Sequence, residues 1–265
     1  MHTDVTDLRN FYQTPLGLMA RRILTQKIRA RWPRLDGLTL AGFGFASPFL
    51  GSFRTEALRI AALMPEGQGA LVWPSSDRNM TVLVEEEHWP LPDNSIDRIL
   101  VIHGLETSNR PAVVLREMWR VLAPAGRLLI VVPNRSGVWA RTDRTPFGQG
   151  RPFSRGQLEQ QLRDSMFTPV GWDSALHLPP IDRGIVVRYG PTFEKVGERV
   201  FRQFAGVMMV EATKELIAPI GKAMPALAAQ KLNPITATVR PRGRGIAAQQ
   251  QRADLPSPSG PRKSL

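Results

Sequence analysis

The sequence of residues 85–134 is EEEHWPLPDNSIDRILVIHGLETSNRPAVVLREMWRVLAPAGRLLIVVPN, and it predicts a loop, a strand, a helix and a second strand. Residues 96–102 are a short, mostly apolar and β-branched run, which is typical of a strand buried in a parallel sheet. Residues 110–122 carry apolar side chains at helical spacing. Residues 127–133, RLLIVVP, form the next buried strand. Because such crossovers are right-handed, the two strands are expected to be parallel neighbours in one βαβ unit.

Several motifs in this stretch resemble those of class I S-adenosylmethionine-dependent methyltransferases of the type 11-like group. They are PDNSID at residues 92–97, LE at 105–106, LREMWRVL at 115–122 and PAGR at 124–127. The family pattern is roughly LPFPDNSFD, LEH, LRE, RVL and PGGR. The resemblance implies a Rossmann-like α/β fold with seven mostly parallel strands, helices on both faces and the last strand antiparallel. It also implies transfer of a methyl group from S-adenosylmethionine to an N, O or C nucleophile.

Length and composition limit the class of protein. A chain of 265 residues is long enough for one α/β domain with a proper core. It contains no cysteine, which excludes disulfides and thiolate metal sites, and its four histidines show no metal-ligand spacing. No apolar run approaches the roughly 18 residues of a membrane span, and the start lacks the order of a signal peptide. We therefore expect a cytoplasmic protein without a metal or a transmembrane segment.

The formal charge of +12 is concentrated at the two ends of the chain. Residues 1–36 hold seven Arg and Lys against three Asp, and residues 239–265 hold six against one. Basic ends can bind nucleic acid or anionic membranes, but solvated basic helix faces and tails are commoner. We expect residues 1–36 to be a helical extension, packed on the domain or acting as a lid, and residues 37–215 to be the methyltransferase-like domain. Residues 216–232 could form a helix, and residues 233–265, rich in Pro, Gly, Gln and Arg, are expected to be disordered.

Residues 38–41 are expected to be the first strand, leading into GFGFA at residues 42–46. Its first two glycines allow a tight turn and a close approach of the backbone to a ligand. The sequence departs from the family at Ala46, where a third glycine is usual, and at Leu40, where an acidic residue is usual. A helix over residues 49–64 is expected to follow. By resemblance, the cofactor-binding residues of this loop are Gly42, Phe43, Gly44 and Ala46.

Residues 69–73 are interpreted as the second strand, ending at Trp73. The family usually ends this strand in Asp or Glu, whose carboxylate binds the ribose hydroxyls, whereas Pro74 follows here. Losing one such charge-assisted hydrogen bond costs about 1.5 to 3 kcal/mol. Trp73 could stack on the adenine, or it could belong to the core.

Residues 80–84 are expected to be the third strand, followed by three glutamates. By register with the family, Glu85, with Glu86 adjacent, accepts a hydrogen bond from the adenine amino group; the alternative is an exposed charged turn. His103 ends the fourth strand at the same edge of the sheet, where doubly wound folds bind ligands. It could be a general base, a cofactor contact or a structural hydrogen-bonding group.

Residues 134–153 mix aromatic and basic side chains with glycine and proline, and they lack the periodicity of a core element. Arginine recognises anions by its planar fork, and aromatic rings stack on flat groups. We therefore interpret this stretch as a loop for an anionic, partly flat substrate, the alternative being an ordered linker. Its candidate substrate residues are Arg135, Trp139, Arg141 and Arg144.

The rest of the domain is expected to contain a helix from Arg155, capped by Ser154, and a strand over residues 167–178. A helix over residues 191–204 and a final strand over residues 206–212 would complete it. Besides a methyltransferase, the departures from the family pattern leave open a catalytically inactive binding or regulatory module. RNA binding through the basic ends is a third hypothesis.

Overall fold

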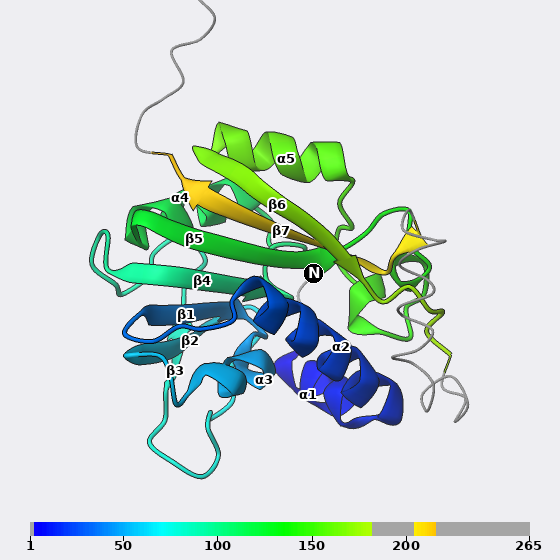
Figure 1. Ribbon diagram of the computed structural model, residues 1–265. Coiled ribbons are helices and arrows are strands. Elements are labelled where there is room, and N and C mark those ends of the chain that lie inside the picture. Colours follow the sequence, from blue (N-terminus) through cyan, green and yellow to red (C-terminus); the bar gives the residue numbers. More distant parts are fainter. Residues whose placement is uncertain (1–2, 182–203, 216–265) are drawn as a thin grey trace, which may run out of the picture. The chain divides into compact units, whose positions relative to one another are not determined.

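The computed structural model describes residues 3–181 and 204–215, and all of these lie in the compact unit formed by residues 1–219. Seven strands form one sheet in the order β3-β2-β1-β4-β5-β7-β6 (Figure 1). The strands are β1 (Thr39–Gly44), β2 (Arg59–Pro65), β3 (Thr81–Val84), β4 (Ile96–Ile102), β5 (Leu122–Pro133), β6 (Phe167–Ala175) and β7 (Val207–Lys214). Only β7 runs antiparallel to its neighbours. The predicted fold class is confirmed.

Helices cover both faces of the sheet. The α-helices are α1 (Val5–Gln13), α2 (Pro15–Arg31), α3 (Ser47–Leu50), α4 (Pro111–Val121) and α5 (Arg155–Asp164). Three short 3-10 helices are η1 (Gly51–Phe53), η2 (Trp139–Arg141) and η3 (Pro146–Gly148). None of the helices within the described ranges has the length and apolarity needed to cross a membrane.

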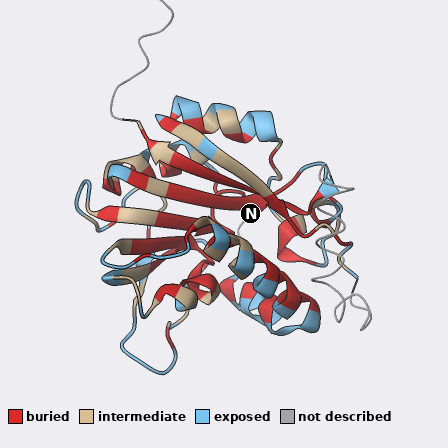
Figure 2. Cartoon of the chain, viewed as in Figure 1, coloured by how far each residue is buried: buried red, intermediate tan, exposed pale blue. Residues whose placement is uncertain are grey.

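Two apolar clusters make the core, one on each face. In β4, Leu100 and Ile102 pack into the cluster beneath α1, α2 and α3, whereas Ile99 and Val101 pack into the cluster beneath α4 and α5. This alternation follows from the period of two in a strand. Figure 2 shows the central strands buried and the outer faces of the helices exposed.

The expected N-terminal helix is present as two helices that meet at Thr14. Asp4 caps α1 by accepting from the backbone N–H of Thr6, and the Thr14 side chain caps α2 by accepting from Gly17. Pro15 occupies the first turn of α2, where no hydrogen bond from its nitrogen is needed.

The βαβ unit and the helix after it agree with the sequence. β4 and α4 lie where the apolar runs predict, and β4 pairs in parallel with β5. β5 contains the predicted strand over residues 127–133 but begins earlier, at Leu122. Ser154 caps α5 in a reciprocal capping box with Gln157. The strand predicted over residues 167–178 ends earlier, at Ala175.

The prediction for residues 49–73 was wrong. In place of a helix over residues 49–64, the chain forms only α3 and η1 and then enters β2, while residues 69–73 form no strand. β2 pairs in parallel with β1 on one side and β3 on the other. A short apolar run is compatible with both helix and buried strand, and here pairing with two neighbours decides the outcome. The helices and tail predicted within residues 182–203 and 216–265 lie outside the described residues.

Candidate functional site

The carboxyl ends of β1, β2, β3 and β4 meet at one edge of the sheet. The strand order reverses between β1 and β4, because β2 and β3 lie to one side of β1 and the later strands lie beyond β4. Open α/β sheets bind ligands at such a switch point. The residues that follow these four strands are therefore the first place to look for a site.

Gly42 and Gly44 lie in the last three residues of β1, rather than in a loop after the strand, and this end of β1 is packed against the end of β4. Gly44 has a φ of +78°, and a Cβ there would lie 2.5 Å from the Ile102 carbonyl oxygen and 2.8 Å from the Gly104 Cα. A Cβ on Gly42 would lie 2.7 Å from the Ala46 Cβ. Both glycines are thus required by the packing of the protein itself. Ala46 occupies part of the space that a side chain at Gly42 would need.

His103 lies at the end of β4 in a fully buried hydrogen-bonding cluster. Its Nε2 is 2.8 Å from the Tyr12 hydroxyl of α1, and its Nδ1 is 3.2 Å from Oε1 of Glu106. The side-chain amide of Gln68 donates to the His103 carbonyl at 2.7 Å. Burial, aided by the charge of Glu106, raises the pKa of Tyr12 well above its ordinary value. The cluster ties α1 to the β4 edge.

Aromatic rings close this part of the edge. Tyr12 stacks on Phe45 of the glycine loop with ring centroids 5.7 Å apart, and its edge meets Phe49. The ring centroids of Phe147 and His103 lie 4.7 Å apart. All of these side chains are buried, as are Phe43 and Leu40. We call this region, comprising Tyr12, Phe45, Phe49, His103 and Phe147, the closed half of the edge.

The neighbouring part of the edge is an open, acidic groove of about 360 Å³. It lies beyond the ends of β2 and β3 and is lined by Glu66, Gly67, Glu85, Glu86, Glu87, His88, Asn109 and Arg110. We call it the open half. Within it, Glu85 pairs with His88 and Glu87 with Arg110, while Glu86 accepts from the Ser108 hydroxyl at 2.6 Å.

Glu66 is the residue that the sequence analysis missed. It follows the last residue of β2 directly, and its backbone N–H donates to the Val84 carbonyl at the end of β3. Its exposed carboxylate forms no ion pair with any residue in the described ranges. An acidic residue therefore does end the second strand. Trp73 lies instead in the connection between β2 and β3, where it packs partly buried against the core.

The candidate substrate residues between 134 and 153 do not form one continuous surface. Trp139 is fully buried and donates its indole N–H to the Leu178 carbonyl at 2.7 Å, so it is a core residue. Arg141 and Arg144 are exposed. Arg135 is also exposed, and it lines a hollow of about 360 Å³ together with Arg151 and Gln157.

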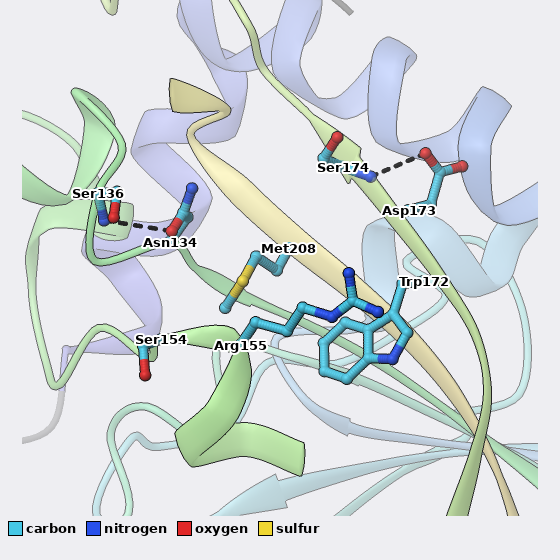
Figure 3. Close-up of a pocket in the computed structure, with 8 residues that line it drawn as sticks. All are labelled: Asn134, Ser136, Ser154, Arg155, Trp172, Asp173, Ser174 and Met208. Carbon is cyan, nitrogen blue, oxygen red and sulfur yellow. Dashed lines mark hydrogen bonds between the residues drawn. The ribbon is translucent and has the colours of Figure 1, made fainter. Parts of the chain in front are cut away.

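A larger hollow, of about 530 Å³, lies where β5, β6 and β7 meet the start of α5. It is lined by Asn134, Ser136, Ser154, Arg155, Trp172, Asp173, Ser174 and Met208 (Figure 3). None of the candidate residues from the sequence lines it. Among the described residues, no three His, Asp or Glu side chains are grouped so that they could hold a metal ion.

Comparisons with known proteins point to one family. A family model for a methyltransferase domain matches residues 70–130. Two relatives named ubiquinone/menaquinone biosynthesis C-methyltransferase UbiE come from Paraburkholderia phymatum and Azotobacter vinelandii, and both are 44% identical, over 59 and 50 residues. These matches cover 22% and 19% of this chain and only 24% and 20% of the relatives.

Solved structures share the fold at lower identity. An S-adenosylmethionine-dependent methyltransferase from Mesorhizobium loti has a TM-score of 0.53 at 14% identity, covering 71% of this chain and 96% of that one. One from Aquifex aeolicus has a TM-score of 0.52 at 16% identity, covering 79% and 98%. The [4+2]-cyclase SpnF has a TM-score of 0.51 at 23% identity, covering 74% and 80%. Because a cyclase is among these neighbours, the fold does not by itself fix the reaction.

Proposed function

We propose that this protein, which belongs to the class I S-adenosylmethionine-dependent methyltransferase family, transfers a methyl group from S-adenosylmethionine to a small-molecule acceptor. The observation that carries the proposal is the position of Glu66. It supplies a free carboxylate at the end of β2, in one groove with Glu85 and Glu86 from the end of β3. The groove lies beyond the ends of β2 and β3, on the same carboxyl edge as the switch point between β1 and β4, and ligands bind at that edge in this class of fold.

The open half suits the nucleoside end of the cofactor. The Glu66 carboxylate would accept hydrogen bonds from the ribose hydroxyls, and Glu85 or Glu86 would accept one from the adenine amino group. Glu66 would thus take the role of the acidic residue that the family usually has at the end of the second strand. Trp73 has no part in this arrangement. When bound, S-adenosylmethionine supplies an electrophilic methyl group on a cationic sulfonium, so the protein has mainly to align the acceptor and exclude water.

The closed half has to change when the cofactor binds. Tyr12 stacks on Phe45 and both rings are buried beside residues 42–44, where in this proposal the methionine end would lie. α1 is held there by the Tyr12–His103 hydrogen bond and by the backbone bond from Val5 to the Gln68 carbonyl. We infer that α1 acts as a cover that moves away from residues 42–46 as the cofactor enters.

That movement would expose His103 in a defined orientation. In this proposal Nδ1 donates its proton to Glu106, and Nε2 accepts from the Tyr12 hydroxyl. Once Tyr12 leaves, Nε2 can accept a proton from the acceptor substrate, while Glu106 keeps the ring in place. His103 is in this proposal the general base, and Glu106 is its positioning residue.

The test is a calorimetric titration with S-adenosylhomocysteine, the demethylated product, which needs no knowledge of the acceptor. Glu66→Gln should weaken binding about tenfold to a hundredfold, because a charged acceptor of hydrogen bonds is lost. Glu159→Gln on α5 is the matched control, since Arg163 on the same helix is the one described residue with which Glu159 forms an ion pair. Equal affinity in the Glu66→Gln variant and the wild type would rule out the assigned role.

The closed half also favours a second candidate function, a methyltransferase-like module that binds or regulates without catalysis. In that case Tyr12 and Phe45 fill the cofactor site permanently. Failure of the wild type and of Tyr12→Ala to bind S-adenosylhomocysteine at millimolar concentration would support this alternative. RNA binding through residues 233–265, which lie outside the described ranges, would instead show as affinity that falls steeply with salt. We also propose that the protein resides in the cytoplasm.

A further inference from the structure

The hollow at the start of α5 is lined by one cationic side chain, that of Arg155. The Arg155 guanidinium lies over the Trp172 ring, 4.8 Å from its centroid. Figure 3 shows the side chain extended across the hollow toward that ring. Among residues 3–181 and 204–215, no acidic side chain forms an ion pair with it. A planar fork of N–H donors is thus held in place by stacking, with its donors available to a ligand.

The remaining lining of the hollow leaves this positive charge uncancelled. Its one acidic residue, Asp173, already accepts from Lys27 at 3.2 Å and from the backbone N–H of Ser174. Among the first backbone N–H groups of α5, that of Gln157 donates to the capping Ser154, and the helix end carries partial positive charge. An anion is therefore the favoured ligand.

Positive charge also lies on the other side of the turn at Ser154 and Arg155. Arg135 and Arg151 line the neighbouring hollow, which contains no acidic residue. Neither forms an ion pair with a residue that the structure describes. The turn at Ser154 and Arg155 is thus approached from both sides by arginine, which would draw an anion to this edge.

The apolar part of the lining indicates what the anion is attached to. Trp172 and Met208 supply a ring and a thioether beside the polar groups of Ser136 and Ser174. A volume of about 530 Å³ falls within the range of small-molecule pockets. The chemistry fits a small molecule with a flat, apolar body and one anionic group.

We propose that this hollow binds a small carboxylate with an aromatic body, with the carboxylate on Arg155 and the ring against Trp172 and Met208. That this carboxylate is the methyl acceptor rests on the proposed function; the binding itself does not. An anionic, partly flat ligand is what the arginine-rich loop predicts, but the residues that recognise it are Arg155 and Trp172 rather than Trp139 and Arg144.

The experiment uses 2-naphthoate as the probe and the full chain labelled with 5-fluorotryptophan. The chain has six tryptophans, and the fluorine resonance of Trp172 is assigned by its loss in Trp172→Phe. Titration of 2-naphthoate should shift the Trp172 resonance saturably. Arg155→Gln should weaken this binding about tenfold to a hundredfold, and so should replacing the probe with neutral 2-naphthamide.

Arg163→Gln is the control, because Arg163 lies on the same helix and pairs with Glu159 outside the hollow. Equal binding to the wild type and Arg155→Gln, or no shift of Trp172 at millimolar probe, would overturn the inference. A parallel titration with S-adenosylhomocysteine separates the two proposals. If the protein binds 2-naphthoate but not S-adenosylhomocysteine, the ligand site at the hollow is supported and the proposed methyltransferase function is refuted. If it binds S-adenosylhomocysteine but not 2-naphthoate, the methyltransferase function is supported and the ligand site is refuted.

Discussion

The open and closed halves of the carboxyl edge use the same sheet in opposite ways. In the open half, acidic side chains line an open groove and make few contacts that the fold needs. In the closed half, the glycine loop and His103 are buried beneath α1 and packed among aromatic rings. A substitution in the open half should therefore affect ligand binding, whereas one in the closed half should affect stability first. Loss of binding after a change in the glycine loop is not, by itself, evidence of a cofactor contact.

Gly44→Ala should have the largest effect on stability. A side chain at φ +78° costs about 1 to 2 kcal/mol, and displacing the Ile102 and Gly104 backbone adds about 1 to 3 kcal/mol. We expect the free energy of unfolding, measured with urea, to fall by about 2 to 5 kcal/mol. Gly51→Ala is the control, since a Cβ there meets nothing within 4 Å. Equal stability of the two variants would show that the closed half is loosely packed.

Tyr12→Phe should have the next largest effect. It removes the hydrogen bond to His103 and leaves the buried Nε2 without its partner, which costs about 1 to 3 kcal/mol. Urea unfolding at neutral pH measures this loss directly. A cost near zero would mean that α1 is not held by His103, and the cover would then be looser than the structure indicates.

Alkaline pH should weaken the closed half through the same hydroxyl. The pKa of Tyr12 is raised by burial in the folded protein, so the folded state keeps a proton that the unfolded state releases near pH 10. The unfolded state binds fewer protons there, and the contribution of Tyr12 falls by about 1.4 kcal/mol per pH unit above 10. Between pH 8 and 11, the free energy of unfolding should fall more steeply with pH for the wild type than for Tyr12→Phe. The same dependence on pH in both proteins would contradict the buried position of Tyr12.

Glu66→Gln and Glu85→Gln should have the smallest effects on stability. Both carboxylates are exposed, and the pair of Glu85 with His88 lies at the surface, where such pairs contribute little. We expect changes within about 0.5 kcal/mol, as is usual for surface substitutions. A larger loss in thermal unfolding would mean that the groove is structural and would weaken its assignment as a ligand site.

The sequence predicts most of the elements of this fold, because β1, β3, β4, β5, β6, β7, α4 and α5 all overlap their expected ranges. β4, α4 and β5 combine unbroken apolar runs with a helical stripe, and α5 starts at a clear capping box. β2 was missed because its residues Ile60 to Met64 fit a helix as well as a buried strand. Once β2 was misplaced, Glu66 could not be identified as the residue that ends it.

The site depends on contacts that no local pattern carries. Tyr12 and His103 are 91 positions apart, and their hydrogen bond exists only because α1 crosses the edge of the sheet. Trp139 lies in a loop that resembles a solvated surface, yet it is buried by Phe147 and by Gly206, which has no room for a side chain. Arg155 meets Trp172 from a different element. The sequence thus indicates which aromatic and charged residues are candidates for the site, but it does not indicate which residues they contact.

Hydrogen exchange with and without saturating S-adenosylhomocysteine tests the central claim most directly, namely that the cofactor enters at the open half and displaces the cover of the closed half. The account predicts slower exchange at residues 42–46 and 85–88, and faster exchange in α1 as its contacts with His103 and Gln68 are lost. Unchanged or slower exchange in α1 under full binding would contradict it, and so would the absence of any change at residues 85–88.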